Sequence, residues 1–344
     1  MSGESIAFWA SRAPAILVAA ALSSTLLIIL FGPLLEHYAM ARPNARSSHE
    51  VPTPQGGGIA VILATIGISY AAFCYLPTDA AAPPLEFPIV TAAVALIAAV
   101  GVLADTHPEN IWLRLLLQTL AVVAVISVLP HDSRVLPILP LPAERIALVI
   151  GGLWFVNLVN FMDGLDLMTV AEAVPITAAL AVLGLFGFLP PPAIVVSLAL
   201  CGAMIGFAYF NRPVAKLFLG DVGSLPIGLL LGWLLVLLAG NGGRAAAILL
   251  PLYYLADSTL TLIRRAFYGE RIWQAHRSHF YQRATDRDFS VSQVVRRVFV
   301  VNLVLCSLAI TTVLLPGLLI TIAALVGGVT LVGGLLVTFG RGTR

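Results

Sequence analysis

Long apolar runs fill this chain and restrict what it can fold into. About eleven windows are long and apolar enough to be read as membrane-crossing helices, which need roughly 20 such residues each. Only 10% of the residues are charged, 59% are hydrophobic and the mean hydropathy is +0.98, whereas about a quarter of a soluble domain is charged. We therefore expect an all-α integral membrane protein with about 11 transmembrane helices. The windows lie near residues 14–35, 57–77, 88–104, 113–130, 145–161, 169–189, 192–210, 222–239, 245–263, 298–315 and 317–338.

Basic residues are distributed unevenly over the segments between these windows. Loops rich in Lys and Arg stay in the cytoplasm, and an outer N-terminus with an inner C-terminus leaves just four basic residues outside. These four are Arg12, Arg134, Arg145 and Arg244. The first window exceeds the 7–15 residues typical of a signal-peptide core, so we expect a retained helix. No linker or internal repeat interrupts residues 1–344, which we expect to form one domain with a basic cytoplasmic loop at 264–297.

Five aspartates lie at or near the inner ends of four predicted helices. Carboxylates at that depth are costly unless they pair, line a wet cavity or hold a cation, so we expect a polar cavity open to the cytoplasm. The five are Asp105, Asp163, Asp166, Asp221 and Asp257.

The stretch NLVNFMDGLD, residues 157–166, holds two of these aspartates and two asparagines, Asn157 and Asn160. If the helix continues through NFMDGLD, Asp163 and Asp166 share one face with Asn160, because residues three apart are neighbours on a helix. Taken alone, this stretch is equally compatible with a solvated helix end.

The stretch KLFLGDVGSLPIG, residues 216–228, places Asp221 between two glycines at the start of a predicted helix. Glycines allow close backbone approach and helix N-terminal amides favour phosphate. Mg²⁺ prefers one or two carboxylates with phosphate oxygens and water, so Asp221 is a candidate metal ligand. The alternative is a simple capping turn.

Two other stretches could bind phosphate. PTPQGGG, residues 52–58, could offer the amides of Gly56 and Gly57 to a phosphate or sugar, or could be a tight loop between helices. AHRSHFYQR places His276 and His279 three residues apart, flanked by arginines that are suited to a diphosphate. Attraction to anionic headgroups is the alternative for this basic loop.

These motifs, in this order and together with GVLADTHPENIWLRLLLQ, resemble the polyprenyl-phosphate N-acetylhexosamine-1-phosphate transferases of glycosyltransferase family 4. The resemblance covers about residues 50–290. The form HRSHFYQR is closer to the O-antigen-initiating branch than to the related peptidoglycan phospho-MurNAc-pentapeptide transferases, which tend to have consecutive histidines. A bundle of ten or eleven helices with a cytoplasmic active-site cleft is implied.

The resemblance also implies a reaction. An N-acetylhexosamine-1-phosphate passes from a UDP-sugar to undecaprenyl phosphate, with release of UMP, at the cytoplasmic face of a bacterial inner membrane. The implied cofactor is Mg²⁺, with Mn²⁺ as an alternative. The implied partners are the two substrates and membrane lipid, with a possible homodimer and no nucleic acid.

Residue roles follow from the matching motif positions. The resemblance implies metal binding by Asp221 and Asp105, and nucleotide contacts by residues such as Phe218. The residues expected to take part in catalysis are Asp105, Asp163, Asp221, His276 and His279. Those expected to bind substrate are Asn157, Asn160, Asp166, Lys216, Phe218, Arg277, Arg283, Gly56 and Gly57.

The chain departs from the family pattern at Ala104, where the first aspartate of a pair is usual. A phosphate monoester is already substantially ionised near pH 7, because its second pKa is about 6. We therefore expect Asp105 to suffice. The competing hypotheses are a secondary transporter, since intramembrane acids also mark ion pathways, and an inactive scaffold of the same fold.

Overall fold

The computed structural model describes residues 3–41, 52–75, 86–106, 110–130, 132–271 and 276–341. The described chain is almost entirely helical, with one antiparallel pair of two-residue strands. The elements are α1 (Gly3–Tyr38), β1 (Met40–Ala41), β2 (Thr53–Pro54), α2 (Gly58–Tyr75), α3 (Glu86–Thr106), α4 (Ile111–Ser127), α5 (Leu141–Met162), α6 (Met168–Leu185), α7 (Pro191–Asn211), α8 (Asp221–Gly240), α9 (Arg244–Leu249), α10 (Leu252–Phe267), α11 (Phe280–Thr285), α12 (Val291–Leu314) and α13 (Leu318–Arg341).

Long apolar helices confirm the expected all-α membrane architecture, but not the expected number of spans. Among the described residues, nine helices are long and apolar enough to cross a membrane. The window at 113–130 gives α4, which has 17 residues. The window at 245–263 is split between α9 and α10 around Pro251, which has no N–H to continue a helix. The predicted orientation places Arg42, Arg46 and Arg344 on the inner side, but these residues lie outside the described ranges.

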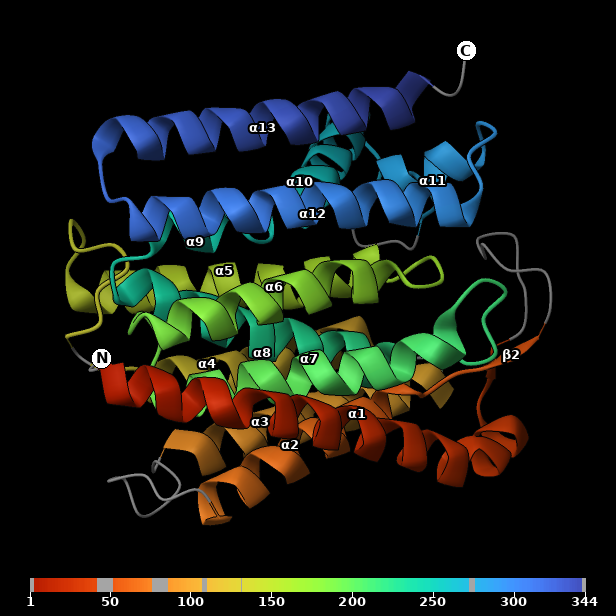
Figure 1. The fold of residues 1–344 in the computed structure, drawn as a ribbon. Coiled ribbons are helices and arrows are strands. Elements are labelled where there is room, and N and C mark those ends of the chain that lie inside the picture. Colours follow the sequence, from red (N-terminus) through yellow and green to blue (C-terminus); the bar gives the residue numbers. More distant parts are fainter. Residues whose placement is uncertain are drawn as a thin grey trace.

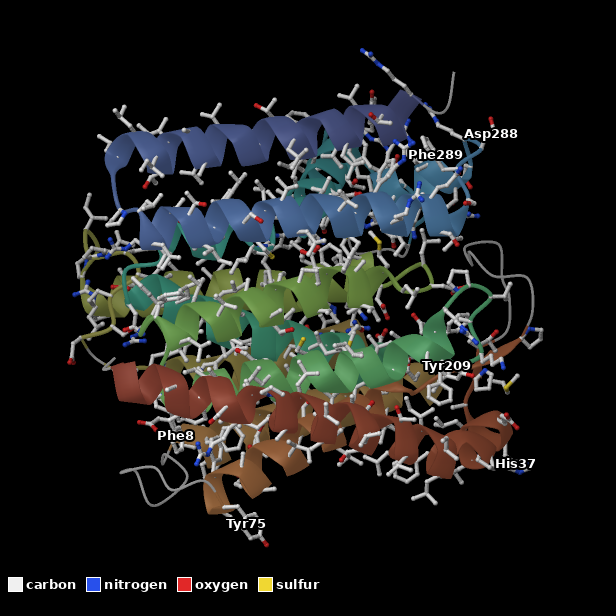
Figure 2. All side chains as sticks on the ribbon, viewed as in Figure 1. Phe8, His37, Tyr75, Tyr209, Asp288 and Phe289 are labelled. Carbon is white, nitrogen blue, oxygen red and sulfur yellow. The ribbon has the colours of Figure 1, made fainter. Side chains whose placement is uncertain are left out.

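The bundle is built around α8, as Figure 1 shows. In the most apolar window of α8, 89% of the residues are buried, compared with 22% in α1 and 28% in α13. Apolar side chains project outward from these two peripheral helices in Figure 2. Such an exposed apolar exterior is what a surrounding bilayer requires.

Close backbone contacts hold the start of α8 against α2 and α3. A Cβ atom on Gly58 would lie 2.1 Å from the Cα of Gly223, and one on Gly101 would lie 2.4 Å from the Cα of Val222. Only residues without side chains allow such an approach. The glycines of this region therefore bring three helices together at one end of the bundle.

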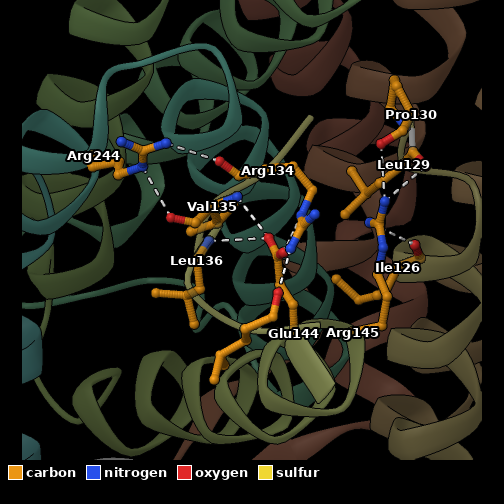
Figure 3. A network of polar contacts seen from close by, with 10 residues as sticks. Ile126, Leu129, Pro130, Arg134, Val135, Leu136, Glu144, Arg145 and Arg244 are labelled. Carbon is orange, nitrogen blue, oxygen red and sulfur yellow. Dashed lines mark hydrogen bonds and ion pairs between the residues drawn. The ribbon is translucent and has the colours of Figure 1, made fainter. Parts of the chain in front are cut away.

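A network of polar contacts fixes the opposite end of the bundle (Figure 3). Glu144 of α5 is 1% exposed. Its carboxylate pairs with Arg134 and accepts hydrogen bonds from the amides of the next two residues, at 2.6 and 3.0 Å. Arg244 and Arg145 donate to backbone carbonyls of the same region. This network ties the connection between α4 and α5 to the start of α9.

The end of the bundle that carries β1, β2 and α11 is called the site end below, and it lies at the right of Figure 1. Here Gln55 forms a parallel β-bridge with Phe218. The segment that leads into α8 is thereby joined to the segment that leads into α2. The candidate cleft opens at this end.

Candidate active site

A cleft of about 530 Å³ lies at the site end. It brings together residues from five regions that are far apart in the sequence, including four of the five aspartates singled out above. Its polar lining consists of Thr53, Gln55, Asp105, Asn160, Asp163, Asp166, Asn211, Asp221 and Gln282, with Phe218 among the apolar residues.

Asp221, the first residue of α8, is the centre of a charged cluster in this cleft. Its carboxylate lies 3.0 Å from Nη1 of Arg114 and accepts a hydrogen bond of 2.7 Å from Nδ2 of Asn160. The second guanidinium nitrogen of Arg114 donates to Oδ1 of Asn160 at 3.0 Å. The Asp221 side chain remains 28% exposed. It is therefore held in one orientation while still facing the cleft.

Asp105 positions Asp221 by capping α8. Its two carboxylate oxygens accept hydrogen bonds from the amides of Asp221 and Val222, at 3.0 and 3.1 Å. A carboxylate is favourable there because the first amides of a helix have no partner within the helix and carry partial positive charge. Gly220 allows this contact, because its φ of +76° suits glycine and a Cβ would lie 2.6 Å from Oδ2 of Asp105.

The NFMDGLD stretch is not a continuous helix, which corrects the shared face predicted for Asp163 and Asp166. Helix α5 ends at Met162, and Asp163 follows as its C-cap residue. The carboxylate of Asp163 accepts a hydrogen bond from Oγ1 of Thr169. That of Asp166 accepts one of 3.0 Å from the amide of Ala215. Both acids still line the cleft, but they come from a loop.

Asn157 lies one turn deeper than Asn160 on α5. Its amide donates to Oε1 of Gln118 at 2.9 Å, and it is absent from the lining of the cleft. The geometry favours a role in holding α4 against α5 over a direct contact with substrate.

The histidine segment is anchored by Asp257, which is completely buried on α10. Its carboxylate lies 3.3 Å from Nδ1 of His279 and accepts the amides of Phe280 and Tyr281 at 3.0 and 3.1 Å. One carboxylate therefore orients the imidazole and caps the start of α11. The His279 side chain is 2% exposed, and His279 is absent from the lining of the cleft.

Helix α11 in turn packs on the loop that carries Asp163. The hydroxyl of Tyr281 donates to the carbonyl of Phe161 at 3.0 Å. A Cβ on Gly164 would lie 2.2 Å from that hydroxyl and 3.1 Å from Nε2 of Gln282. Gln282 itself lines the cleft. The histidine segment thus contacts the acidic loop through α11.

The other predicted residues of this segment lie at its outer side. His276 stacks on the ring of His279, with centroids 4.9 Å apart. Burial lowers the pKa of His276 to about 4, with the positive charges of His279, Arg265 and Arg264 acting in the same direction. The guanidinium of Arg277 pairs with Asp286 at 3.0 Å. His276, Arg277 and Arg283 are all absent from the cleft lining.

The glycine-rich stretch forms hydrogen bonds with two segments that line the cleft. The amide of Gly57 donates to the carbonyl of Phe218 at 2.9 Å, and Nε2 of Gln55 donates to the carbonyl of Asp105 at 2.8 Å. Gly56 has a φ of +103° and, like Lys216, is absent from the lining. The Gly57 amide is engaged with protein, which favours the tight-loop interpretation over a phosphate contact.

Charge in the cleft bears on the metal prediction. Four carboxylates line it, and Arg114 is paired with Asp221. Such a lining repels a diphosphate unless a cation joins the two. Among the described residues, no group of three or more His, Cys, Asp or Glu side chains could hold a metal. One or two carboxylates are what Mg²⁺ uses when substrate phosphates complete its ligands, so the donors fit Mg²⁺ better than Zn²⁺.

Several residues of the site escaped the sequence-based prediction. The sequence analysis gave Arg114 no role in the site, although an arginine inside an apolar window is costly unless paired. Gln282 lies a few residues after the histidines, but no sequence pattern marked it as a site residue. Asn211 bridges the amide of Leu167 and the carbonyl of Leu217, at 2.7 and 2.9 Å, and its position at the end of α7 revealed nothing of this.

Comparison with known proteins agrees with this arrangement. Residues 87–239 match the family model described as glycosyl transferase family 4. This region runs from α3 to α8 and contains Asp105, Asp163 and Asp221, but not the histidine segment.

Curated relatives extend the similarity over most of the chain. A probable undecaprenyl-phosphate N-acetylglucosaminyl 1-phosphate transferase of Bacillus subtilis (strain 168) is 26% identical over 284 residues, covering 78% of this chain and 76% of the relative. A decaprenyl-phosphate N-acetylglucosaminephosphotransferase of Mycolicibacterium smegmatis is 28% identical over 339 residues, covering 87% and 81%. A phospho-N-acetylmuramoyl-pentapeptide-transferase of Oceanobacillus iheyensis is 42% identical over 72 residues, which is 21% of this chain and 22% of the relative. The helical membrane fold, the cluster of carboxylates at one end of the bundle and the match of residues 87–239 to glycosyl transferase family 4 agree with these similarities.

Proposed function

We propose that this protein transfers an N-acetylhexosamine-1-phosphate from a UDP-sugar to undecaprenyl phosphate. A phosphate oxygen of the lipid attacks the β-phosphorus of the UDP-sugar, and a new P–O bond forms. The bond from that phosphorus to the bridging oxygen breaks, and UMP leaves with its electron pair. The observation that carries the proposal is the meeting of Asp105, Asp163 and Asp221 in one cleft at the site end.

The residues of the acidic cleft have different roles in this proposal. Phosphoryl transfer depends mainly on positioning and on electrostatic stabilisation of the phosphate oxygens. Asp221 would hold Mg²⁺ or Mn²⁺ together with Asp163 or Asp105, and the ion, when bound, supplies the positive charge that draws the two phosphates together. Asn160 keeps the Asp221 carboxylate oriented through its 2.7 Å hydrogen bond.

In this proposal Asp105 positions Asp221 and can also serve as a ligand of the metal. Both of its oxygens already accept amides of α8, so the location of Asp221 depends on it. Ala104 removes no contact that this cap requires, which supports an active enzyme over an inactive scaffold. A transporter is less well supported, because the acids gather at one end of the bundle instead of near its middle.

The cellular setting is proposed on the same grounds. UDP-sugars are cytosolic and the lipid phosphate lies at the membrane surface, so we place the site end at the cytoplasmic face of a bacterial inner membrane. The N-terminus is then outside and the C-terminus inside. The form of the histidine motif supports initiation of O-antigen or another cell-surface polysaccharide, and a homodimer is part of the proposal.

Release of UMP by purified protein in detergent tests the reaction. The assay contains undecaprenyl phosphate, Mg²⁺ and a panel of UDP-N-acetylhexosamines, with EDTA and Asp221→Asn as controls for the metal and its ligand. Asp132→Asn is a matched control, because Asp132 is exposed at the opposite end of the bundle.

We expect release with at least one sugar, unaffected by Asp132→Asn and abolished by EDTA and Asp221→Asn. Folded protein that binds UDP-sugar but releases no UMP with any sugar would overturn the proposal. Unchanged release from Asp221→Asn would overturn the assignment of the site.

A further inference from the structure

A second hollow lies between α12 and α13, separate from the cleft. It is a groove of about 780 Å³ that shares no lining residue with the cleft. Arg296 and Arg297 lie at one end of it, while Val301 and Leu335 belong to its apolar walls. The side chains that line it therefore change from charged to apolar along its length, as a lipid molecule does.

The charged end of the groove lies at the site end of the bundle. Arg296 and Arg297 are both exposed, and the guanidinium of Arg297 lies 4.9 Å above the ring of Phe289. Phe289 packs edge-on against Phe339 of α13 at 5.8 Å, and Figure 2 shows Phe289 near the end of that helix. This stacking holds one arginine at the boundary of the apolar bundle. No carboxylate lines the groove among the described residues.

The apolar part of the groove has unfilled space. Gly334 lines it and is exposed, and a Cβ built on Gly334 would meet no atom within 4 Å. In a bilayer this space must be filled by lipid, because α13 is a peripheral helix with little of its surface buried. The groove can therefore accept a hydrocarbon chain without any rearrangement of α12 or α13.

We propose that this groove binds one anionic glycerophospholipid of the surrounding membrane. Its phosphate is bound by Arg296 and Arg297, and an acyl chain lies along Val301, Gly334 and Leu335. Guanidinium groups bind phosphate with paired hydrogen bonds, and basic pockets between transmembrane helices near the membrane surface bind anionic headgroups. Asp288, which precedes Phe289 in the sequence, is exposed and does not line the groove. The two arginines are therefore the charged residues of its lining.

The polyprenyl substrate is a poorer occupant than a phospholipid. A phosphate bound by Arg296 and Arg297 would lie in a hollow that includes none of the cleft residues. The bound lipid would therefore be a resident of the fold and not a reactant. The inference therefore does not depend on the proposed reaction.

Native mass spectrometry of delipidated protein in detergent tests this inference. The protein is titrated with phosphatidylglycerol, phosphatidylcholine or undecaprenyl phosphate, and the bound fraction is measured for each. Arg296→Gln/Arg297→Gln removes the charge, and Arg296→Lys/Arg297→Lys retains it. Gly334→Leu fills the groove, and Gly333→Leu is its matched control, because Gly333 also has open space at its Cβ but does not line the groove.

We expect one phosphatidylglycerol to bind more tightly than phosphatidylcholine. Each arginine near an anionic headgroup contributes about a fivefold change in affinity, so the double Gln variant should bind about thirtyfold more weakly. The double Lys variant should keep more binding than the double Gln variant, because it keeps the charge but not the paired hydrogen bonds. Gly333→Leu should retain binding, whereas Gly334→Leu should lose it. Equal binding of both phospholipids, or equal loss in the two leucine variants, would overturn the proposal. Tighter binding of undecaprenyl phosphate that is lost in Gly334→Leu would overturn the choice of occupant.

Discussion

Replacement of Asp257, which does not line the cleft, by asparagine should weaken the docking of the histidine segment on the bundle. The carboxylate accepts the amides of Phe280 and Tyr281 through different oxygens. An asparagine retains one oxygen and turns the other position into an NH₂ donor that faces an amide N–H. At least one buried amide of α11 then loses its partner.

The size of this effect follows from the lost hydrogen bond. A hydrogen bond to a charged group contributes about 1.5–3 kcal/mol, and the buried donor that remains is costly. We therefore expect the docking of α11 to weaken by about 2–3 kcal/mol, or roughly 30- to 150-fold in the docking equilibrium. Because Tyr281 and Gln282 contact the loop of Asp163, turnover should fall as well.

Hydrogen exchange and UMP release together measure this prediction. Amides of residues 276–286 should exchange about 30- to 150-fold faster in Asp257→Asn, and kcat should fall. Thr261→Val is the matched control, because its hydroxyl donates to the same carboxylate at 3.3 Å but is not the group that joins this carboxylate to α11. Wild-type protection of residues 276–286 in Asp257→Asn would refute this reasoning, as would equal loss of protection in Thr261→Val.

Three further predictions concern other parts of the molecule. Glu144→Ala leaves Arg134 and two amides without their carboxylate, so Tm should fall with a loss of about 2–4 kcal/mol, while UMP release per folded molecule stays unchanged; a large loss of specific activity would contradict the separation of the two ends. Asn160→Asp replaces the donor to Asp221 by a second carboxylate, and kcat/KM should fall about a hundredfold; a value within threefold of the wild type would contradict the orienting role. Burial lowers the pKa of His276 to about 4, below its ordinary value near 6.5, so its contribution to stability is complete above pH 6.5 and is lost as the pH falls towards 4. His276→Asn should accordingly flatten the dependence of Tm on pH in that window, and an unchanged slope would count against it.

The helices were predictable because apolar length alone determines them in a membrane protein. Each predicted window overlaps helical structure in the described ranges, although the windows at 113–130 and 169–189 run past the ends of α4 and α6. The number of uninterrupted spans differed where Pro251 divides one window into α9 and α10. The gathering of carboxylates was predictable in part, because Asp105, Asp163, Asp166 and Asp221 meet in the cleft as expected. Asp257 was predicted to join them, but it lies inside α10 and is absent from the cleft lining.

The predicted shared face of Asp163 and Asp166 failed for a reason that lies elsewhere in the chain. Gly164 leaves room for the hydroxyl of Tyr281, which belongs to α11 and bonds to the last turn of α5. Because that partner is more than 100 residues away, the local pattern could not reveal that the helix ends at Met162. Asp105 is similar, since its bonds to the amides of α8 join helices that are far apart in the sequence.

The backbone contacts of Gly58, Gly101 and Gly223 have a consequence for how mutations in this protein are read. None of the three lines the cleft, yet a side chain at any of them would force α8 away from α2 or α3. Asp221 would move with its helix, and activity would disappear as completely as if a reacting group had been removed. In a scan of every substitution, these glycines would score like catalytic residues, and measuring protein abundance beside activity would distinguish variants that fail to assemble from variants that assemble but cannot react.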